Sequence, residues 1–139
     1  MAAHLEIGQR EKEGITILDL KGRLVVGDAA TALRDCITRC KDAGKLRIIL
    51  NLQGVEYIDS SGLGALVICF TSLQKAGGAL KLTNLNRRNI ELLLLTKLST
   101  VFEIFETEQD AVNSFFPERE IRRFDILSFV QQQEAEQEG

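Results

Sequence analysis

The chain is poor in the residues that many enzymes use for catalysis. Its 139 residues include no tryptophan and a single histidine, His4, which stands close to the start. A serine–histidine arrangement or a histidine-rich zinc site is therefore not expected. The sequence also lacks the Gly-x-x-x-x-Gly-Lys-Ser/Thr pattern that cradles phosphate groups. We predict a protein that is not an enzyme and that uses no metal and no cofactor.

The sequence also lacks a strong charge imbalance and long apolar runs. The net charge is −3, with 27% charged residues, which gives no general attraction to nucleic acid or anionic lipid. No apolar run approaches the roughly 18 residues needed to span a bilayer. Residues 1–10 lack the basic and then apolar pattern of a signal peptide. We expect a cytoplasmic protein that binds neither a membrane nor nucleic acid directly.

Cysteine is scarce and odd in number. The three cysteines are Cys36, Cys40 and Cys69, and an odd count without a signal peptide argues against a disulfide framework. A zinc site would need two further ligands, and His4 is the only histidine. We therefore expect all three to be small buried hydrophobic residues.

The chain does contain a regular alternation of strand-like and helix-like segments. Strands are predicted at residues 4–12, 15–20, 46–52, 79–85 and 101–105, and helices at 28–43, 61–76, after Asn86 and after Thr107. Gly22 is expected to end the second strand, and Asp28 to cap the first helix. The prediction is an α/β fold with a mostly parallel sheet of four or five strands, in the order β-β-α-β-α-β-α-β-α.

The stretch from Tyr57 to Ala65 connects the most apolar strand to a helix. Its sequence, Tyr-Ile-Asp-Ser-Ser-Gly-Leu-Gly-Ala, offers Asp59 and two serines as partners for the free N–H groups at the helix start, with Ser61 expected to act as a cap. Gly62 and Gly64 would let another backbone or a bulky group approach closely. On these residues alone, a capped helix with packing glycines is the simplest interpretation.

The predicted helix that follows has two apolar faces. Its core stripe is expected to consist of Leu63, Leu66, Val67, Phe70 and Leu73. Ala65, Ile68 and Cys69 project roughly opposite, where they are either covered by another part of the chain or free for a partner.

The composition changes after Pro117, which suggests a domain at residues 1–116 and a C-terminal extension at 117–139. The apolar residues of segment 124–130 spread around a helical wheel, so we expect this segment to dock on its own domain or on another molecule. One hypothesis is a homodimer formed through the extension, with a frayed acidic end.

The residues from Asn51-Leu52 through Ile58-Asp59-Ser60-Ser61-Gly62-Leu63-Gly64-Ala65-Leu66 resemble the signature of the STAS domain of anti-sigma factor antagonists. The resemblance covers about residues 4–116. It implies that the unphosphorylated protein binds an anti-sigma factor that is also a serine kinase, which frees a sigma factor. It further implies that this kinase phosphorylates Ser60 to switch binding off, and that a PP2C-type phosphatase restores the unmodified state.

The expected docking surface combines this turn with the apolar loop before the first helix. Its residues are Leu24, Val25, Val26, Gly27, Asp28, Asp59, Ser60, Ser61, Gly62, Ala65, Ile68 and Cys69. One residue departs from the pattern, because many members with this switch carry an acid where Val25 stands. An alternative function is therefore a STAS scaffold or ligand-binding module, in a signalling or transport complex, without a phosphorylation cycle.

Overall fold

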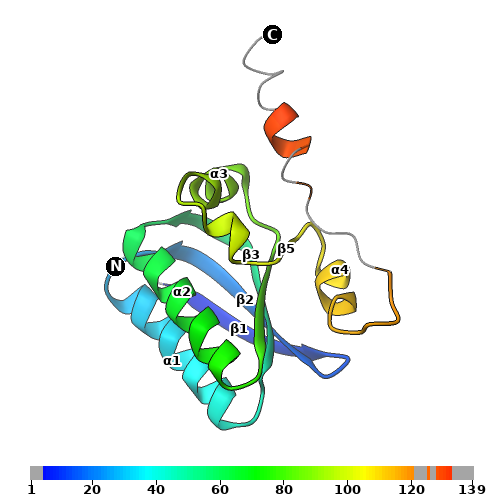
Figure 1. Cartoon of the computed structure of the whole chain (residues 1–139). Helices are drawn as coiled ribbons and strands as arrows, with labels where there is room; N and C mark the ends of the chain where they lie inside the picture. The colour runs from blue at the N-terminus through cyan, green and yellow to red at the C-terminus, as the bar shows by residue number, and fades with distance from the viewer. Residues whose placement is uncertain (1–4, 121–124, 126–127, 133–139) are drawn as a thin grey trace.

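In the computed structural model, which describes residues 5–120, 125 and 128–132, a five-stranded sheet carries two long helices on one face and a short helix on part of the other (Figure 1). The strands are β1 (Glu6–Lys12), β2 (Ile15–Leu24), β3 (Arg47–Ile58), β4 (Ala79–Thr83) and β5 (Ile104–Phe105). The helices are α1 (Asp28–Asp42), α2 (Ser60–Lys75), α3 (Arg87–Leu95) and α4 (Glu108–Asn113), with a 3-10 turn η1 (Leu98–Thr100). The predicted order of elements is confirmed.

The strands lie in chain order across the sheet, with β1 antiparallel to β2 and every later pair parallel. Helices α1 and α2 lie side by side over one face (Figure 1). They form the larger core with residues such as Leu33, Leu50 and Leu66. Helix α4 covers part of the other face, where Ala111 and Val112 pack on Ile17 and Ile49. The apolar run in β3 is therefore covered on both faces, as its composition predicted.

Glycines inside the central strands form irregularities rather than strand ends. The prediction that Gly22 ends its strand is wrong, because β2 continues to Leu24 with register shifts on both sides of Lys21 and Gly22. Strand β3 likewise passes through Gly54, where a Cβ atom would lie only 2.8 Å from the Leu20 carbonyl oxygen. Bulges at these close approaches let both strands extend to the turn that precedes α2.

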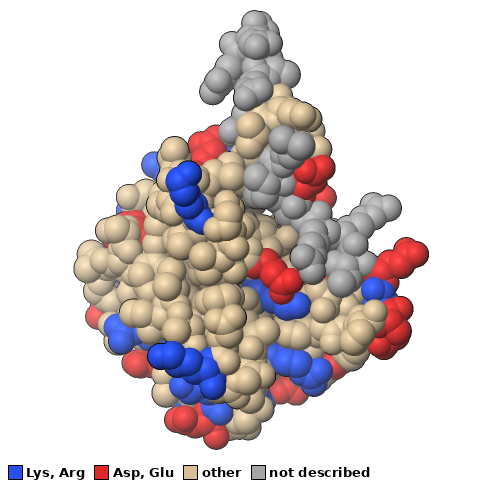
Figure 2. Space-filling view, in the orientation of Figure 1, with Lys and Arg blue, Asp and Glu red and all other residues tan. Residues whose placement is uncertain are grey.

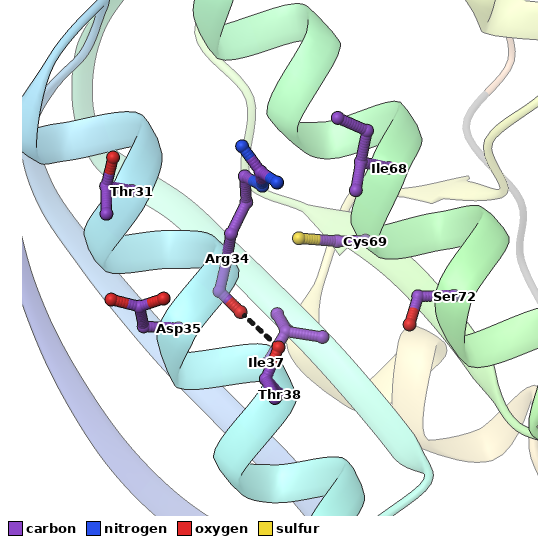
Figure 3. Close-up of a pocket in the computed structure, with 8 residues that line it drawn as sticks. All are labelled: Thr31, Arg34, Asp35, Ile37, Thr38, Ile68, Cys69 and Ser72. Carbon is purple, nitrogen blue, oxygen red and sulfur yellow. Dashed lines mark hydrogen bonds between the residues drawn. The ribbon is translucent and has the colours of Figure 1, made fainter.

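Helix α2 is covered on two sides: Leu63, Leu66 and Leu73 of the predicted stripe are buried in the core, and Val67 packs against it. Ala65 and Cys69 are buried, whereas Ile68 of the same patch is exposed, so only part of the patch is covered. Figure 3 shows the Cys69 thiol directed toward α1. Phe70, predicted to lie in the core, is half-buried and makes an edge-to-face contact with Phe102 at 5.3 Å between ring centroids.

The start of the extension contacts the domain. The Arg119 guanidinium lies 2.6 Å from a Glu13 carboxylate oxygen and 4.1 Å from the centre of the Phe116 ring. Three residues of segment 124–130, at positions 124, 126 and 127, lie outside the described residues. Within it, Phe129 and Val130 belong to a short helical turn at 128–132 and are half-buried. Docking of this segment and a homodimer through it stay predictions.

Candidate partner-binding site

One carboxylate holds together the three segments that meet at the start of α2. Asp59 Oδ1 accepts a hydrogen bond from the Gly62 backbone N–H at 2.8 Å, and Oδ2 accepts one from the Val26 N–H at 3.0 Å. The Asp59 N–H donates to the Leu24 carbonyl oxygen at 3.2 Å. The helix cap and the anchor of the loop between β2 and α1 are therefore the same side chain.

Two predicted caps are wrong, because each of these residues already lies in the first turn of its helix. Ser61 is not the N-cap of α2, because Asp59 holds that position and Ser61 is already in the first turn. Asp28 is not the N-cap of α1, because the helix begins at Asp28 itself and Gly27 precedes it at a φ of 97°. Such a positive φ strains any residue except glycine. The residue before α1 is therefore a glycine that the backbone requires, and it has no side chain with which to cap the helix.

The hydrogen bonds at Asp59 also fix its charge. Burial acts to raise the pKa of this carboxyl group, but N–H donors from Gly62, Val26 and Ser61 outweigh burial and leave the pKa below its ordinary value. Asp59 is consequently an anion at neutral pH, and its acceptor oxygens are already engaged by backbone groups.

The two glycines of the turn have different environments. A Cβ atom at Gly62 would lie 2.0 Å from the Leu24 carbonyl oxygen and 3.0 Å from Ile58 Cγ2. No heavy atom lies within 4 Å of a Cβ built at Gly64, which faces open space. Gly62 therefore lets the end of β2 lie against the start of α2, whereas Gly64 leaves a gap on the surface.

The two serines open onto different cavities. Ser60 lines a cavity of about 260 Å³ together with Tyr57, Leu63 and Arg88, between the end of β3 and α3. Ser61 lines a shallow cavity of about 330 Å³ between α1 and α2. Successive helical residues are rotated by about 100°, so the two neighbouring serines lie on different sides of α2.

The cavity beside Ser61 belongs to a longer groove between α1 and α2. It shares Thr31, Arg34 and Ile68 with a second cavity of about 250 Å³ farther along the two helices (Figure 3). Val26 at one end is 70% exposed and Ile68 is 49% exposed. The surface over α2 carries few charged groups in the view of Figure 2. We name this surface the α1–α2 groove.

The predicted docking set is brought to one end of the molecule, but only part of it is accessible. Val26, Gly27, Asp28, Ser60 and Ile68 are exposed, and Val25, Asp59 and Ser61 are half-buried. Leu24, Gly62, Ala65 and Cys69 are buried, which corrects the expectation that they could present side chains to a partner. These four buried residues pack underneath the exposed residues of the set.

Sequence reasoning missed the walls contributed by α1 and α3. Arg34 and Thr31 line the α1–α2 groove, and Arg88 and Asn89 line the cavity beside Ser60. The Arg88 guanidinium lies 4.9 Å from the centre of the Tyr57 ring. Asn89 donates from Nδ2 to the Val55 carbonyl oxygen, whereas its buried Oδ1 has no hydrogen-bond partner. Nothing in the local pattern of α3 indicates that it faces the turn at Ser60.

Within the described part of the chain, no group of three histidine, cysteine or acidic residues is placed to hold a metal ion. None of the described helices is long and apolar enough to cross a membrane. The described cysteines are free thiols and all are buried, as predicted.

Comparisons with known proteins identify the family of the chain. The family model described as "STAS domain" matches residues 7–111, which is most of the chain. The anti-sigma-B factor antagonist of Bacillus subtilis strain 168 is 29% identical over 109 residues, covering 78% of this chain and 98% of that protein.

Solved structures show the same fold. An anti-sigma factor antagonist from Mycobacterium paratuberculosis aligns with a TM-score of 0.71 at 20% identity, over 79% of this chain and 92% of that one. The Bacillus cell fate determinant SpoIIAA in its phosphorylated form aligns with a TM-score of 0.62 at 20% identity, over 79% of this chain and 99% of that one. The family match, together with this shared fold, shows that the chain belongs to the STAS domain family.

Proposed function

We propose that this protein is an anti-sigma factor antagonist controlled by phosphorylation of Ser60. The unphosphorylated form binds an anti-sigma factor that is also a serine kinase, and a sigma factor is released. Phosphorylation by that kinase ends the binding, and a PP2C-type phosphatase restores it. The protein acts by binding rather than by catalysis. The similarity to the anti-sigma-B factor antagonist supports the general role, and the geometry of the turn supports the switch.

The observation that carries the proposal is the position of Ser60. It is exposed and occupies the first position of α2, directly after the Asp59 cap. The same Asp59 carboxylate holds the loop that presents the exposed Val26. A kinase docked on the loop would therefore lie beside its substrate hydroxyl group.

The partner must reach across the start of α2. The exposed apolar side chains Val26 and Ile68 line the α1–α2 groove, whereas Ser60 faces α3. Phosphorylation adds a charge of about −1.5 to −2, next to the anionic Asp59. An interface that had closed over a neutral hydroxyl group would instead have to desolvate this charged phosphate. We expect a loss of at least about 3 kcal/mol, which is more than a hundredfold in Kd.

The switch is tested by incubating the protein with a purified anti-sigma factor kinase and ATP, followed by intact mass measurement. Wild type and Ser61→Ala should each gain one phosphate, and Ser60→Ala should gain none while keeping its affinity for the kinase. Ser60→Asp should bind weakly, although its charge is smaller than that of a phosphate. A phosphate located on Ser61, or unchanged affinity of Ser60→Asp for a kinase that binds wild type, would contradict the switch.

The docking surface has its own test. Val26→Asp and Ile68→Asp should weaken kinase binding by at least tenfold without a large change in stability, because both side chains are exposed. Val101→Asp is the matched control, since Val101 is also exposed, at 41%, but lines neither the α1–α2 groove nor the cavity beside Ser60. Equal losses in all three variants would argue against the groove.

A second candidate is a STAS scaffold or ligand-binding module that has no phosphorylation cycle. Val25 favours it, because an apolar half-buried residue stands where many members with the switch carry an acid. The unpaired Asn89 Oδ1, on a residue that lines the cavity beside Ser60, also favours it. Stable binding to an anti-sigma factor with no labelling of Ser60 would support this alternative.

A further inference from the structure

We propose that Arg88 is the intramolecular receptor for the phosphate on Ser60. The inference rests on the proposed phosphorylation and deepens it, because it specifies where the phosphate goes after transfer. Ser60 and Arg88 are both exposed and line the same cavity of about 260 Å³. Residues of β3, α2 and α3 thus meet where a phosphate on Ser60 would project.

A phosphate at this position needs a cation, because the helix start is already occupied. N–H groups at a helix N-terminus ordinarily stabilise an anion. Here Asp59 accepts from the Gly62 N–H and from the Val26 N–H of the preceding loop. The phosphate would therefore lie beside a carboxylate that is itself ionised at neutral pH. Like charges so close together raise the free energy of the dianion unless a positive group compensates.

Arg88 is the cation that lines this cavity. Its titratable neighbours in the wall are Tyr57 and Asp59. The Arg88 guanidinium lies over the Tyr57 ring, with its carbon 4.9 Å from the ring centre, and no ion pair to a carboxylate is formed by Arg88 within the described residues. Arginine binds phosphate through two parallel N–H donors. Exchanging a ring contact for a phosphate would move an exposed side chain within the cavity that both residues line.

Two other arginines near the cavity provide controls. Arg87 precedes Arg88 on α3 but lies 3.8 Å from the Glu91 carboxylate. Arg23 on β2 is paired in register with Tyr57 but does not line the cavity. Removing either one changes the net charge by the same amount as removing Arg88, so a general electrostatic effect would appear in all three variants.

The test uses protein in which phosphoserine is incorporated at position 60 by genetic encoding, so that no kinase is required. The ³¹P resonance is followed from pH 4 to 8 in wild type, Arg88→Gln, Arg87→Gln and Arg23→Gln. The second pKa of phosphoserine is ordinarily about 6. We expect it to be lower in wild type by about half a unit or more, and to rise above 6 in Arg88→Gln because Asp59 is then uncompensated. The control variants should resemble wild type.

Tyr57 supplies a second readout, since it is the only tyrosine in a chain without tryptophan. Phosphorylation should change the Tyr57 fluorescence in wild type, because Arg88 leaves the ring, but should have little effect in Arg88→Gln. An unshifted phosphoserine pKa in wild type, or equal shifts in all three arginine variants, would overturn the proposal. Failure of a kinase to label Ser60 would instead contradict the proposed function and leave these measurements unaffected.

Discussion

The close packing at Gly62 makes a quantitative prediction about the start of α2. A methyl group in Gly62→Ala would lie 2.0 Å from the Leu24 carbonyl oxygen, 2.9 Å from the Leu24 carbonyl carbon and 3.0 Å from Ile58 Cγ2. Two of these three atoms belong to the backbone at the end of β2, and the carbonyl oxygen also accepts the Asp59 N–H. The clash can be relieved only by moving the helix start away from the strand.

The expected cost follows from three terms. Overpacking of this kind costs about 1–3 kcal/mol, and loss of the hydrogen bond from Asp59 to Leu24 costs about 1 kcal/mol. Alanine recovers up to about 1 kcal/mol because it favours a helix more than glycine does. Because backbone rather than a flexible side chain must move, we expect Gly62→Ala to lose about 2–3 kcal/mol of unfolding free energy.

The assay is urea denaturation, with Gly64→Ala as the matched control. A Cβ atom at Gly64 meets no heavy atom within 4 Å and the residue is exposed, so this variant should gain about 0.5–1 kcal/mol. The slope of unfolding free energy against urea concentration should be the same in both variants and wild type, so differences in the denaturation midpoint report differences in stability. A loss below about 1 kcal/mol in Gly62→Ala, or equal changes in both variants, would refute this account of the turn.

Three further predictions concern ionisable groups. Hydrogen bonding holds the pKa of Asp59 below its ordinary value. The Asp59 carboxylate therefore stabilises the fold at a pH above the ordinary pKa, and this contribution is lost as the pH falls through the folded-state pKa. Asp59→Asn, which can still cap α2, should lose less unfolding free energy than wild type when melts at neutral and acidic pH are compared. Burial raises the pKa of the Cys69 thiol to about 12 and also raises the pKa of the Cys36 thiol. At pH 8 both thiols should therefore react with a thiol-specific disulfide reagent only as fast as the protein opens. Rapid labelling of the native protein would contradict this prediction. The hydrogen bond from Arg10 outweighs burial and lowers the pKa of Glu108. Glu108→Gln should therefore cost about 1 kcal/mol at neutral pH, and this cost should shrink as the pH falls through the folded-state pKa, as measured by thermal melts.

Much of the fold could be predicted because its signals are local. The helices predicted after Asn86 and Thr107 are present, and each of these residues caps its helix by accepting a backbone N–H three residues later. A side chain that caps a helix acts within one turn, so its identity and position are visible in the sequence. The alternation of strands and helices is similarly local, and it correctly predicted the order of elements.

The errors concern features that depend on a neighbouring segment. Gly22 resembles the end of a strand in the sequence, but β3 lies alongside it and the ladder continues through an irregularity. Cys69 and Ala65 form an apolar patch on a helical wheel, and only the three-dimensional packing shows that they are buried. The position of Arg88 beside Ser60 depends on how α3 crosses the end of β3. No periodicity within α3 contains that information.

The separation of Ser60 from the α1–α2 groove has a consequence for how the proposed switch would work. Ser60 and Ser61 line different cavities on either side of the start of α2, so a phosphate on Ser60 would project toward α3 rather than into the groove that Val26 and Ile68 line. Groove variants should therefore weaken a partner's binding by a similar factor whether or not Ser60 is phosphorylated. The ratio of the partner's affinities for the unphosphorylated and phosphorylated forms should depend instead on the charge of residue 60 beside α3. If Ile68→Asp abolished the difference between the two forms, the groove and the switch would be one surface, and the phosphate would have to act by direct obstruction there.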